Sequence, residues 1–471
     1  MSQMASPAER RLDRICRHFC PPLQKLNHVL HQVRISSLFH VLTFSLSVIQ
    51  NCLLPVSLHM MQPSAVLIYA HLLCFKAATR GGQEIDDVAR DPVVIGGMVL
   101  DIHAIPSTSP QPRTTTPGKV RYVLGGVGRN IAECMSKLGT MPYMISAVGD
   151  DIAGNLLLEQ WKLAGLCTEG IRKHQDINTA VICNVYDTDG ELAAAVANVD
   201  ALENFLTPAW IQQCKSSIRS APILVVDANL SPIALEASCQ VAAEFDVPVW
   251  FEPVSVAKST RISSIAKYVT FASPNEDELV SMANAVSGGN TFHLVKRDGN
   301  RKYSGKSLFH KLKPAILVLL EKGIKMLAVT VGEDGLFLCS KNPDFLKFRL
   351  QITQNSRVGE WVYDTLTSTC PPRPVAAMQV EGSSPMFAVH FPALPASVVR
   401  LTGAGDCMVA GTVASLCSGL DVLQSVGVGI AAAKAAIEAE PNVPSIFNLA
   451  DIAGNAKLAY CNAISLCHFE K

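Results

Sequence analysis

The sequence predicts an α/β fold in which helices cover both faces of a mostly parallel sheet. Two observations carry this prediction. From residue 92 onward, short apolar segments alternate with amphipathic ones, and the apolar segments are continuous rather than alternating polar with apolar residues. Strands that are apolar throughout are buried on both faces, as in a parallel sheet. The amphipathic segments between them are predicted to be the crossover helices that join parallel strands.

Each element is predicted from its own pattern. Continuous apolar runs predict the strands of the main sheet at residues 93–95, 144–148, 223–226, 247–251, 268–271 and 327–331. Apolar residues at helical spacing predict helices at residues 130–138, 152–164, 233–245, 276–285, 315–321 and 408–416. Gly139 and Gly165 directly follow two of these helices, and glycine commonly ends a helix.

Two other segments have the period-two alternation of half-exposed strands. They are residues 119–124 and 180–197, and the second contains the turn sequence Asp187-Thr188-Asp189-Gly190. They predict a small sheet packed beside the main one, as a lid. Residues 351–384 contain several prolines and little periodicity, so we expect an inserted loop there.

The composition indicates a large core and no strongly charged surface. Hydrophobic residues make up 49% of the 471 residues, charged residues make up 17%, and the formal net charge is zero. Nucleic-acid-binding proteins need a basic surface, so this class is not expected. The 15 cysteines form no pair with the spacing of a zinc site or a redox motif, which predicts reduced thiols inside a cell.

Residues 1–90 form an atypical N-terminal extension. Residues 35–75 contain no Asp, Glu, Lys or Arg and are long enough to span a membrane, but prolines and polar residues interrupt them, so a membrane segment is not expected. A poorly packed extension and translated non-coding sequence are the alternatives. Residues 11–19 resemble the nonapeptide that directs proteins to peroxisomes, with Phe19 in place of leucine; the alternative is a basic amphipathic turn. The expected location is the peroxisome, and otherwise the cytoplasm.

Residues 401–406, Leu-Thr-Gly-Ala-Gly-Asp, are the most informative for function. Glycines let the backbone turn tightly and approach a ligand, and a helix that starts there points N–H groups and its positive dipole end at that ligand. Such a site binds an anion. Asp406 beside it can accept a proton from a hydroxyl that attacks a phosphoryl group. The alternative is an ordinary acidic residue in the first turn of a helix.

Four further groups of glycines and polar residues lie where predicted strands end or helices begin. In open α/β sheets, ligands bind beyond the carboxyl ends of the strands. Each group alone is equally well explained as a turn, but their order along the chain is informative. The groups are Gly96-Gly97 with Asp101, Gly125-Gly126 with Asn130, residues 275–278, and residues 330–335.

These motifs resemble those of the PfkB or ribokinase family of carbohydrate and nucleoside kinases. Two motifs carry the resemblance: Gly403-Ala404-Gly405-Asp406 with its helix, and Gly125-Gly126-Val127-Gly128-Arg129-Asn130. The resemblance covers residues 92–445 and implies a ribokinase-like three-layer α/β/α sandwich with a small β-sheet lid. The kinase domain would span residues 91–450, and residues 451–471 would be a C-terminal tail.

The resemblance also implies a role for each motif residue. Asp406 would be the general base, and Gly403, Ala404 and Gly405 would hold the charge of the transferred phosphoryl group. The sugar hydroxyls would bind to Asp101, Gly125, Gly126 and Asn130. The nucleotide site would include Asn275, Thr330, Gly332, Gly335 and Asn442, and Glu278 would position magnesium through water. ATP and Mg²⁺ are therefore the expected cofactors.

Four runs, residues 127–133, 190–200, 226–231 and 252–258, resemble pseudouridine kinases more than ribokinase or fructokinase. They imply phosphorylation of the 5′-hydroxyl of pseudouridine in nucleoside catabolism. The alternatives are another nucleoside, a sugar such as ribose or fructose, and a non-catalytic protein with the same fold. Arg400 stands where many family members have an acidic residue that helps bind a monovalent cation, so potassium activation is not expected. The expected partners are ATP and the small-molecule substrate, with a homodimer as an open alternative to a monomer.

Overall fold

The computed structural model describes residues 91–110, 113–189, 191–295, 304–350, 364–365 and 386–466. All of them belong to one compact unit, residues 87–471. The predicted N-terminal extension, including its segments 11–19 and 35–75, lies outside the described residues, and so does nearly all of the predicted insertion at 351–384. In the part of the chain that is described, no helix is long and apolar enough to cross a membrane.

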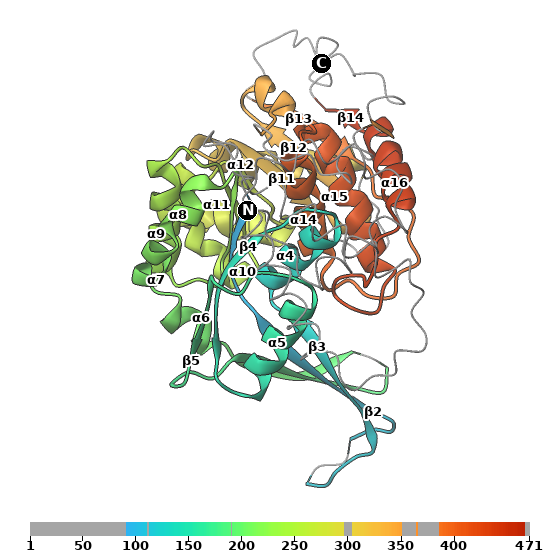
Figure 1. Cartoon of the computed structure of the whole chain (residues 1–471). Coiled ribbons are helices and arrows are strands. Elements are labelled where there is room, and N and C mark those ends of the chain that lie inside the picture. The colour runs from blue at the N-terminus through green and yellow to red at the C-terminus, as the bar shows by residue number, and fades with distance from the viewer. Residues whose placement is uncertain are drawn as a thin grey trace, which may run out of the picture. The chain divides into compact units, whose positions relative to one another are not determined.

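Ten strands of the described chain form the main sheet (Figure 1). Its parallel part has the order β5 (Ile171–His174), β4 (Tyr143–Gly149), β1 (Val93–Ile95), β8 (Leu224–Asp227), β9 (Val249–Glu252), β10 (Phe271–Ala272) and β11 (Met326–Thr330). Antiparallel strands that the sequence did not predict follow β11 at one edge. They are β12 (Leu336–Ser340), β13 (Phe387–Phe391) and β14 (Ile464–Ser465). The predicted sheet is therefore confirmed, with a mixed edge.

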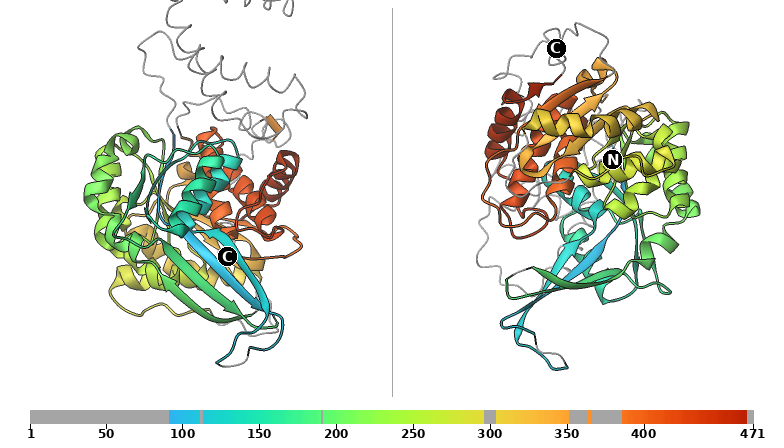
Figure 2. Two further views of the ribbon diagram at one scale, coloured as in Figure 1. Left: turned by 60° about the horizontal axis from the view of Figure 1, so that its bottom comes forward. Right: turned by 180° about the vertical axis from the view of Figure 1, so that it is seen from behind.

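Helices cover both faces of the main sheet, which confirms the three-layer arrangement (Figures 1 and 2). Successive strand residues pack into two separate hydrophobic cores, one on each face of the sheet. Val94 and Val225 belong to one core, and Ile95 and Val226 belong to the other. The first face carries α4 (Val127–Lys137), α5 (Ile152–Leu163), α14 (Ala404–Cys417), α15 (Val422–Ile437) and α16 (Leu449–Cys461). The second carries α6 (Asp200–Phe205), α7 (Pro208–Gln213), α8 (Lys215–Ser220), α9 (Pro232–Glu244), α11 (Glu276–Ser287) and α12 (Gly305–Glu321).

The predicted lid is a four-stranded sheet of the described chain, separate from the main sheet (Figure 2). Its order is β3 (Gly118–Gly125), β2 (Val99–Pro106), β6 (Ala180–Tyr186) and β7 (Leu192–Asn198). The strands β3, β6 and β7 match the predicted segments. The sequence did not predict β2, because its first residues continue the apolar run of β1. Asp101 lies within β2, so the lid itself carries this expected sugar-binding residue.

Three segments differ from their predicted bounds for local reasons. α12 begins at Gly305 rather than at 315, because Ser304 caps it by accepting from Ser307 N at 3.2 Å and the helix continues through Pro314. β10 is shorter than predicted because residues 266–268 form a 3₁₀ turn. The predicted C-terminal tail contributes most of α16 and also β14, which pairs with β13. The fold therefore continues beyond the predicted end of the domain at 450.

Candidate active site

Two helices begin at glycines that the sequence motifs contain. α4 begins after Gly126, whose φ of 94° is left-handed, and a Cβ there would overlap the Gly97 carbonyl. α14 begins after Gly403, whose φ is 86°, and a Cβ there would overlap the Asn442 carbonyl. Only glycine combines a left-handed backbone with so little space, so both turns depend on the residue type in the motif.

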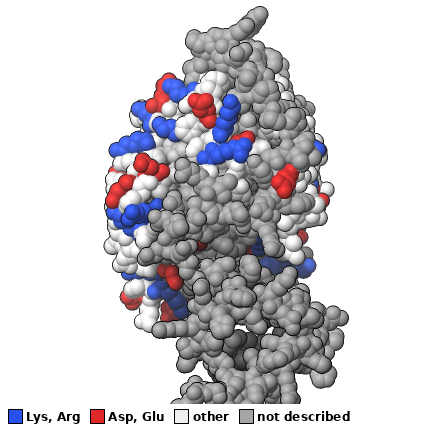
Figure 3. Space-filling model, turned by 45° about the horizontal axis from the view of Figure 1, so that its top comes forward, with Lys and Arg blue, Asp and Glu red and all other residues white. Residues whose placement is uncertain are grey.

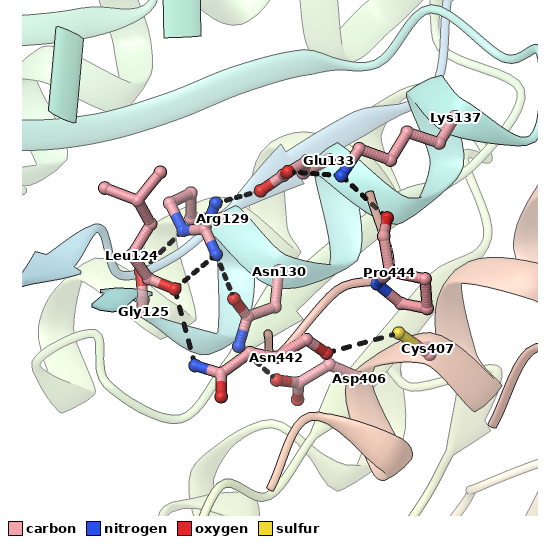
Figure 4. A network of polar contacts seen from close by, with 10 residues as sticks. All are labelled: Leu124, Gly125, Arg129, Asn130, Glu133, Lys137, Asp406, Cys407, Asn442 and Pro444. Atoms are coloured by element: carbon pink, nitrogen blue, oxygen red, sulfur yellow. Dashed lines mark hydrogen bonds and ion pairs between the residues drawn. The ribbon is translucent and has the colours of Figure 1, made fainter. Parts of the chain in front are cut away.

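A hydrogen bond joins the first turns of these two helices. Asn130 Nδ2 in α4 donates to Asp406 Oδ2 in α14 at 2.7 Å, although the two residues are 276 positions apart (Figure 4). Both side chains come from the first turn of a helix, so each lies at the positive end of a helix dipole. The structure thus brings the expected sugar-binding amide next to the expected general base.

Arg129 holds the lid against α4 (Figure 4). Its side chain is almost fully buried, and it donates from Nε to Gly125 O at 2.8 Å and from Nη2 to Leu124 O at 2.7 Å. It also contacts Asn130 Oδ1 and forms an ion pair with Glu133. The sequence reasoning gave Arg129 no role. In the structure its charge lies beside both expected functional carboxylates, Asp101 and Asp406.

The electrostatic environment suits Asp406 for accepting a proton. Burial raises the pKa of Asp406 to about 7, against the hydrogen bond from Asn130, and the nearby Asp227 and Glu278 charges add to the rise. Burial also raises the pKa of Asp101 to about 6, against the charges of Arg129 and Arg400. A base with a pKa near neutrality combines availability of the deprotonated form with sufficient proton affinity.

The first turn of α14 also lines an open cavity of about 850 Å³. Asn275, Thr330, Gly332 and Gly335 line it together with Ala404 and Gly405, so four of the five expected nucleotide-binding residues lie together. Among the described residues, no atom lies within 4 Å of a Cβ built on Gly405, so a ligand can approach this turn closely. Most of the remaining lining is apolar, including Leu336, Met408 and Ile430, which suits the ring of a nucleobase.

Asn275 and Glu278 begin α11 with a capping box. Asn275 Oδ1 accepts from Glu278 N at 2.9 Å, and Glu278 Oε2 accepts from Asn275 N at 2.9 Å. Glu278 is buried, and burial raises its pKa. Its second oxygen, Oε1, can face a metal-bound water. A cation there would offset the repulsion between Glu278 and the nearby carboxylates of Glu252 and Asp406.

These features fit Mg²⁺ bound through water, because Mg²⁺ retains several waters and takes few protein carboxylates. In the described ranges, no group of three or more His, Cys, Asp or Glu side chains is placed to bind a metal ion directly.

Asn442 lies on the sugar side of the site and not in the nucleotide-side cavity. Asn442 Nδ2 donates to Leu124 O at 3.4 Å, and the Asn442 side chain lies near Asp101, where it opposes the burial that raises the pKa of that carboxyl. It lines a second hollow of about 540 Å³ with Arg129 and Arg400. Asn442 is therefore not among the expected nucleotide-binding residues that line the larger cavity. The reason is that the loop after α15 returns under the lid, which the sequence spacing does not reveal.

Arg400 points its charge at the sugar side. Its charge opposes the burial that raises the pKa of Asp101, and it adds to the burial that lowers the pKa of His103. Its Nη1 is buried without a hydrogen-bond partner among the described residues. A fixed positive charge disfavours a cation close to it.

Two buried acids at strand ends belong to the site and were missed by the sequence reasoning. Asp227 ends β8 and accepts from Gly97 N at 2.8 Å and Gly128 N at 2.9 Å. Glu252 ends β9 and accepts from Ser273 Oγ at 2.5 Å. An acid that directly ends a continuous apolar strand was the available signal in both cases.

Comparison with known proteins agrees with this geometry. The model described as "pfkB family carbohydrate kinase" matches residues 89–350 and 380–442. The chain belongs to the PfkB family. As a PfkB kinase it is a phosphotransferase that uses ATP and an alcohol acceptor.

Related PfkB proteins cover most of the chain. It is 54% identical over 375 residues to a pseudouridine kinase from Arabidopsis thaliana, covering 79% of this chain and 97% of the relative. It is 25% identical over 368 residues to a pseudouridine kinase from Escherichia coli, covering 78% and 97%. A structure of Arabidopsis thaliana ribokinase complexed with ribose and ATP matches with a TM-score of 0.58 at 18% identity, covering 79% and 99%. The structural match supports the ribokinase-like fold.

Proposed function

We propose that the protein transfers the γ-phosphoryl group of ATP to the 5′-hydroxyl of pseudouridine, giving pseudouridine 5′-phosphate. The observation that carries the chemistry is the placement of Asp406. It lies between the sugar-side residues Asn130 and Asp101 and the turn, Ala404 and Gly405, that lines the nucleotide-side cavity. The similarity to pseudouridine kinases over most of the chain supports the choice of substrate.

In the proposed reaction, the 5′-oxygen forms a bond to the γ-phosphorus while the bond from that phosphorus to the β–γ bridging oxygen breaks, and ADP leaves. Asp406 takes the hydroxyl proton. The N–H groups of Gly403 and Gly405 stabilise the charge that spreads over the transferred group. The N–H group of Ala404 donates to Leu401 O at 3.3 Å, so it would join them only by leaving that contact. Mg²⁺, held through water near Glu278, would neutralise phosphate charge. Asp101 and Asn130 orient the sugar, so alignment and electrostatics supply most of the rate enhancement.

The test measures ATP consumption by the full chain with pseudouridine, uridine, adenosine, ribose and fructose. The same five assays are repeated with the Asp406→Asn variant. We expect the highest kcat/KM for pseudouridine and loss of turnover in the variant. A preference for ribose or another nucleoside would replace the substrate but keep Asp406 as the base. A folded chain that binds ATP and turns over none of the five would favour the non-catalytic alternative.

Small molecules are the proposed partners in place of nucleic acid. Lys and Arg side chains are interspersed with Asp and Glu over the described part of the surface in Figure 3. Such mixed charge gives no basic path for a phosphate backbone. Binding of the chain to labelled duplex DNA and RNA at low salt tests this: micromolar affinity that weakens with salt would contradict it.

A homodimer through the outer face of the lid is also proposed. The registers align Val120, Ala104, Val185 and Ala194 in one cross-strand row and Tyr122, Ile102, Cys183 and Val196 in the next, on the same face of the sheet. Val120, Tyr122 and Val196 are each more than half exposed. Exposed apolar rows favour association. Light scattering tests this proposal: we expect a dimer for the wild type and a monomer for Tyr122→Asp.

We propose a peroxisomal location and a role in nucleoside catabolism, supported by the resemblance of residues 11–19 to a targeting nonapeptide. The test is imaging of the full chain with a fluorescent protein at its C-terminus. We expect peroxisomal puncta, and a diffuse signal after Arg11→Ala with Leu12→Ala. A diffuse signal from the wild type would contradict the proposal.

A further inference from the structure

The buried carboxylate of Asp227 connects two parts of the chain that carry sugar-side residues. Asp227 Oδ2 accepts from Gly97 N, in the loop after β1, and from Gly128 N, in the first turn of α4. Gly97 leads into β2 and Asp101, and Gly128 is followed two residues later by Asn130. One carboxylate oxygen therefore bridges the loop before Asp101 and the helix turn that carries Asn130, beside a direct hydrogen bond from Arg129 N to Gly97 O at 3.0 Å.

The surrounding residues leave room for this carboxylate and for nothing larger. A Cβ on Gly96 would overlap Asp227, and a Cβ on Gly128 would lie 2.8 Å from Gly96 Cα. The N-cap residue Gly126 offers no side-chain cap, and the first turn of α4 contains no acidic residue. Asp227 therefore supplies from another strand the negative charge that a helix N-terminus usually receives from its own cap.

Two residues of the runs that resemble pseudouridine kinases support Asp227. Asn229 N donates to Asp227 Oδ1 at 2.9 Å, and Lys258 Nζ donates to Asn229 Oδ1 at 2.7 Å. Asn229 is buried and Lys258 is partly buried, so this chain of contacts is largely shielded from solvent. Lys258 also brings a positive charge toward Asp227. A buried carboxylate needs such hydrogen bonds and a countercharge to remain ionised.

We propose that Asp227 is a positioning residue for the acceptor substrate: it holds Asp101 and Asn130 at the separation that lets both bind one sugar, and Asn229 and Lys258 hold Asp227. This role rests on the proposed function, because it requires a sugar hydroxyl as the acceptor. It does not require the sugar to be pseudouridine. Asp227 contacts the loop and the helix rather than the substrate, and its charge also adds to the raised pKa of Asp406.

The decisive measurement is the separate KM of each substrate in Asp227→Asn. The amide removes the negative charge and places an NH2 group against either Asn229 N or the pair Gly97 N and Gly128 N, so the contact that joins the Gly97 loop to α4 weakens. We expect the KM for the acceptor to rise on the order of tenfold, which corresponds to about 1.4 kcal/mol, while the KM for ATP stays within about twofold. The nucleotide-side cavity has no contact with Asp227 that would change it.

Asp421→Ala is the matched control. Asp421 Oδ1 accepts from Gln424 N at 2.9 Å and caps α15, so its loss weakens a helix N-terminus without touching the loop or α4. We expect a lower melting temperature with both KM values unchanged. Equal changes of the two KM values in Asp227→Asn, or no change in either, would overturn the positioning role.

If Asp227→Asn does not fold, Lys258→Gln decides, because it breaks the outer contact and leaves the carboxylate in place. A rise of about threefold in the acceptor KM alone is expected there, and an unchanged acceptor KM would overturn the proposal. The acceptor in all these assays is whichever compound the wild type phosphorylates fastest. A wild type that prefers ribose would end the pseudouridine proposal, while the comparison of KM values would still test Asp227.

Discussion

The N-termini of α4 and α14 are alike in sequence and opposite in use. Each helix begins after a left-handed glycine that supplies no side-chain cap, and each carries a functional side chain in its first turn. Asp227, a buried carboxylate of the protein, occupies the N-terminus of α4. By contrast, the open nucleotide-side cavity lies in front of Gly405 in the first turn of α14.

This difference separates a structural anion site from a substrate anion site. A helix N-terminus binds negative charge wherever it is placed, so the deciding factor is whether the protein provides its own anion. At α4 the carboxylate fixes the helix against the loop after β1 and so positions Asn130. At α14 the site is left for the phosphoryl group of a nucleotide. Substitutions at the two N-termini separate these two uses.

The largest effect is expected from Asp406→Asn. The amide cannot take a proton from the acceptor hydroxyl, so kcat should fall by about 10³. The raised pKa of Asp406 means that its charged form is disfavoured in the fold, so the variant should also be more stable than the wild type at pH 8, on the order of 1 kcal/mol. Turnover assays and thermal unfolding check the two effects. Unchanged turnover would remove Asp406 as the base.

The pH dependence should follow the same carboxylate. The pKa of Asp406 is raised to about 7, and the deprotonated form is the active one, so kcat should fall about tenfold per pH unit below about 7 and level off above it. Stability should change in the other direction. A raised pKa means that the folded state binds the proton more tightly, so this group's contribution falls as pH rises from about 4 to about 7. Rates and melting temperatures between pH 5 and pH 9 test both signs, and a flat acid limb would contradict the assignment.

Gly405→Ala tests the open N-terminus of α14. The added methyl meets no described atom but extends toward the space expected for the phosphates, so the KM for ATP should rise about tenfold. Alanine in a helix should meanwhile raise the stability by about 0.5–1 kcal/mol. Gly454→Ala in α16, also with no atom within 4 Å in the described chain, is the matched control and should gain stability without losing activity. An unchanged KM for ATP in Gly405→Ala would place the phosphates elsewhere.

Gly128→Ala tests the occupied N-terminus of α4, and the effect should appear in stability. Its Cβ would lie 2.8 Å from Gly96 Cα, and neither backbone can move without disturbing the bonds to Asp227. We expect a loss of about 1–3 kcal/mol in the free energy of unfolding, measured with urea. Wild-type stability of this variant would show that the close approach of the two loops is not needed.

Local patterns in the sequence predict much of the fold because they report burial directly. Continuous apolar runs such as the one in β8 are visible without a structure, and so are glycines that end helices. The elements that were missed lack such a signal: β14 is two residues long, and β2 continues the apolar run of β1. α12 was placed too late because Pro314 suggests a helix start, whereas Ser304 provides the actual cap.

The sequence alone determined the chemistry at the centre of the site. A glycine turn followed by an aspartate in the first turn of a helix predicts an anion site with an adjacent carboxylate, because these features depend on neighbouring residues only, whereas burial and distant groups set the pKa of Asp406. Tertiary structure decided which distant groups join it. Asn442 lies on the sugar side and Asp227 joins the Gly97 loop to α4, because the order of the strands and the return of the chain under the lid set those distances. Local sequence carries no record of such long-range contacts.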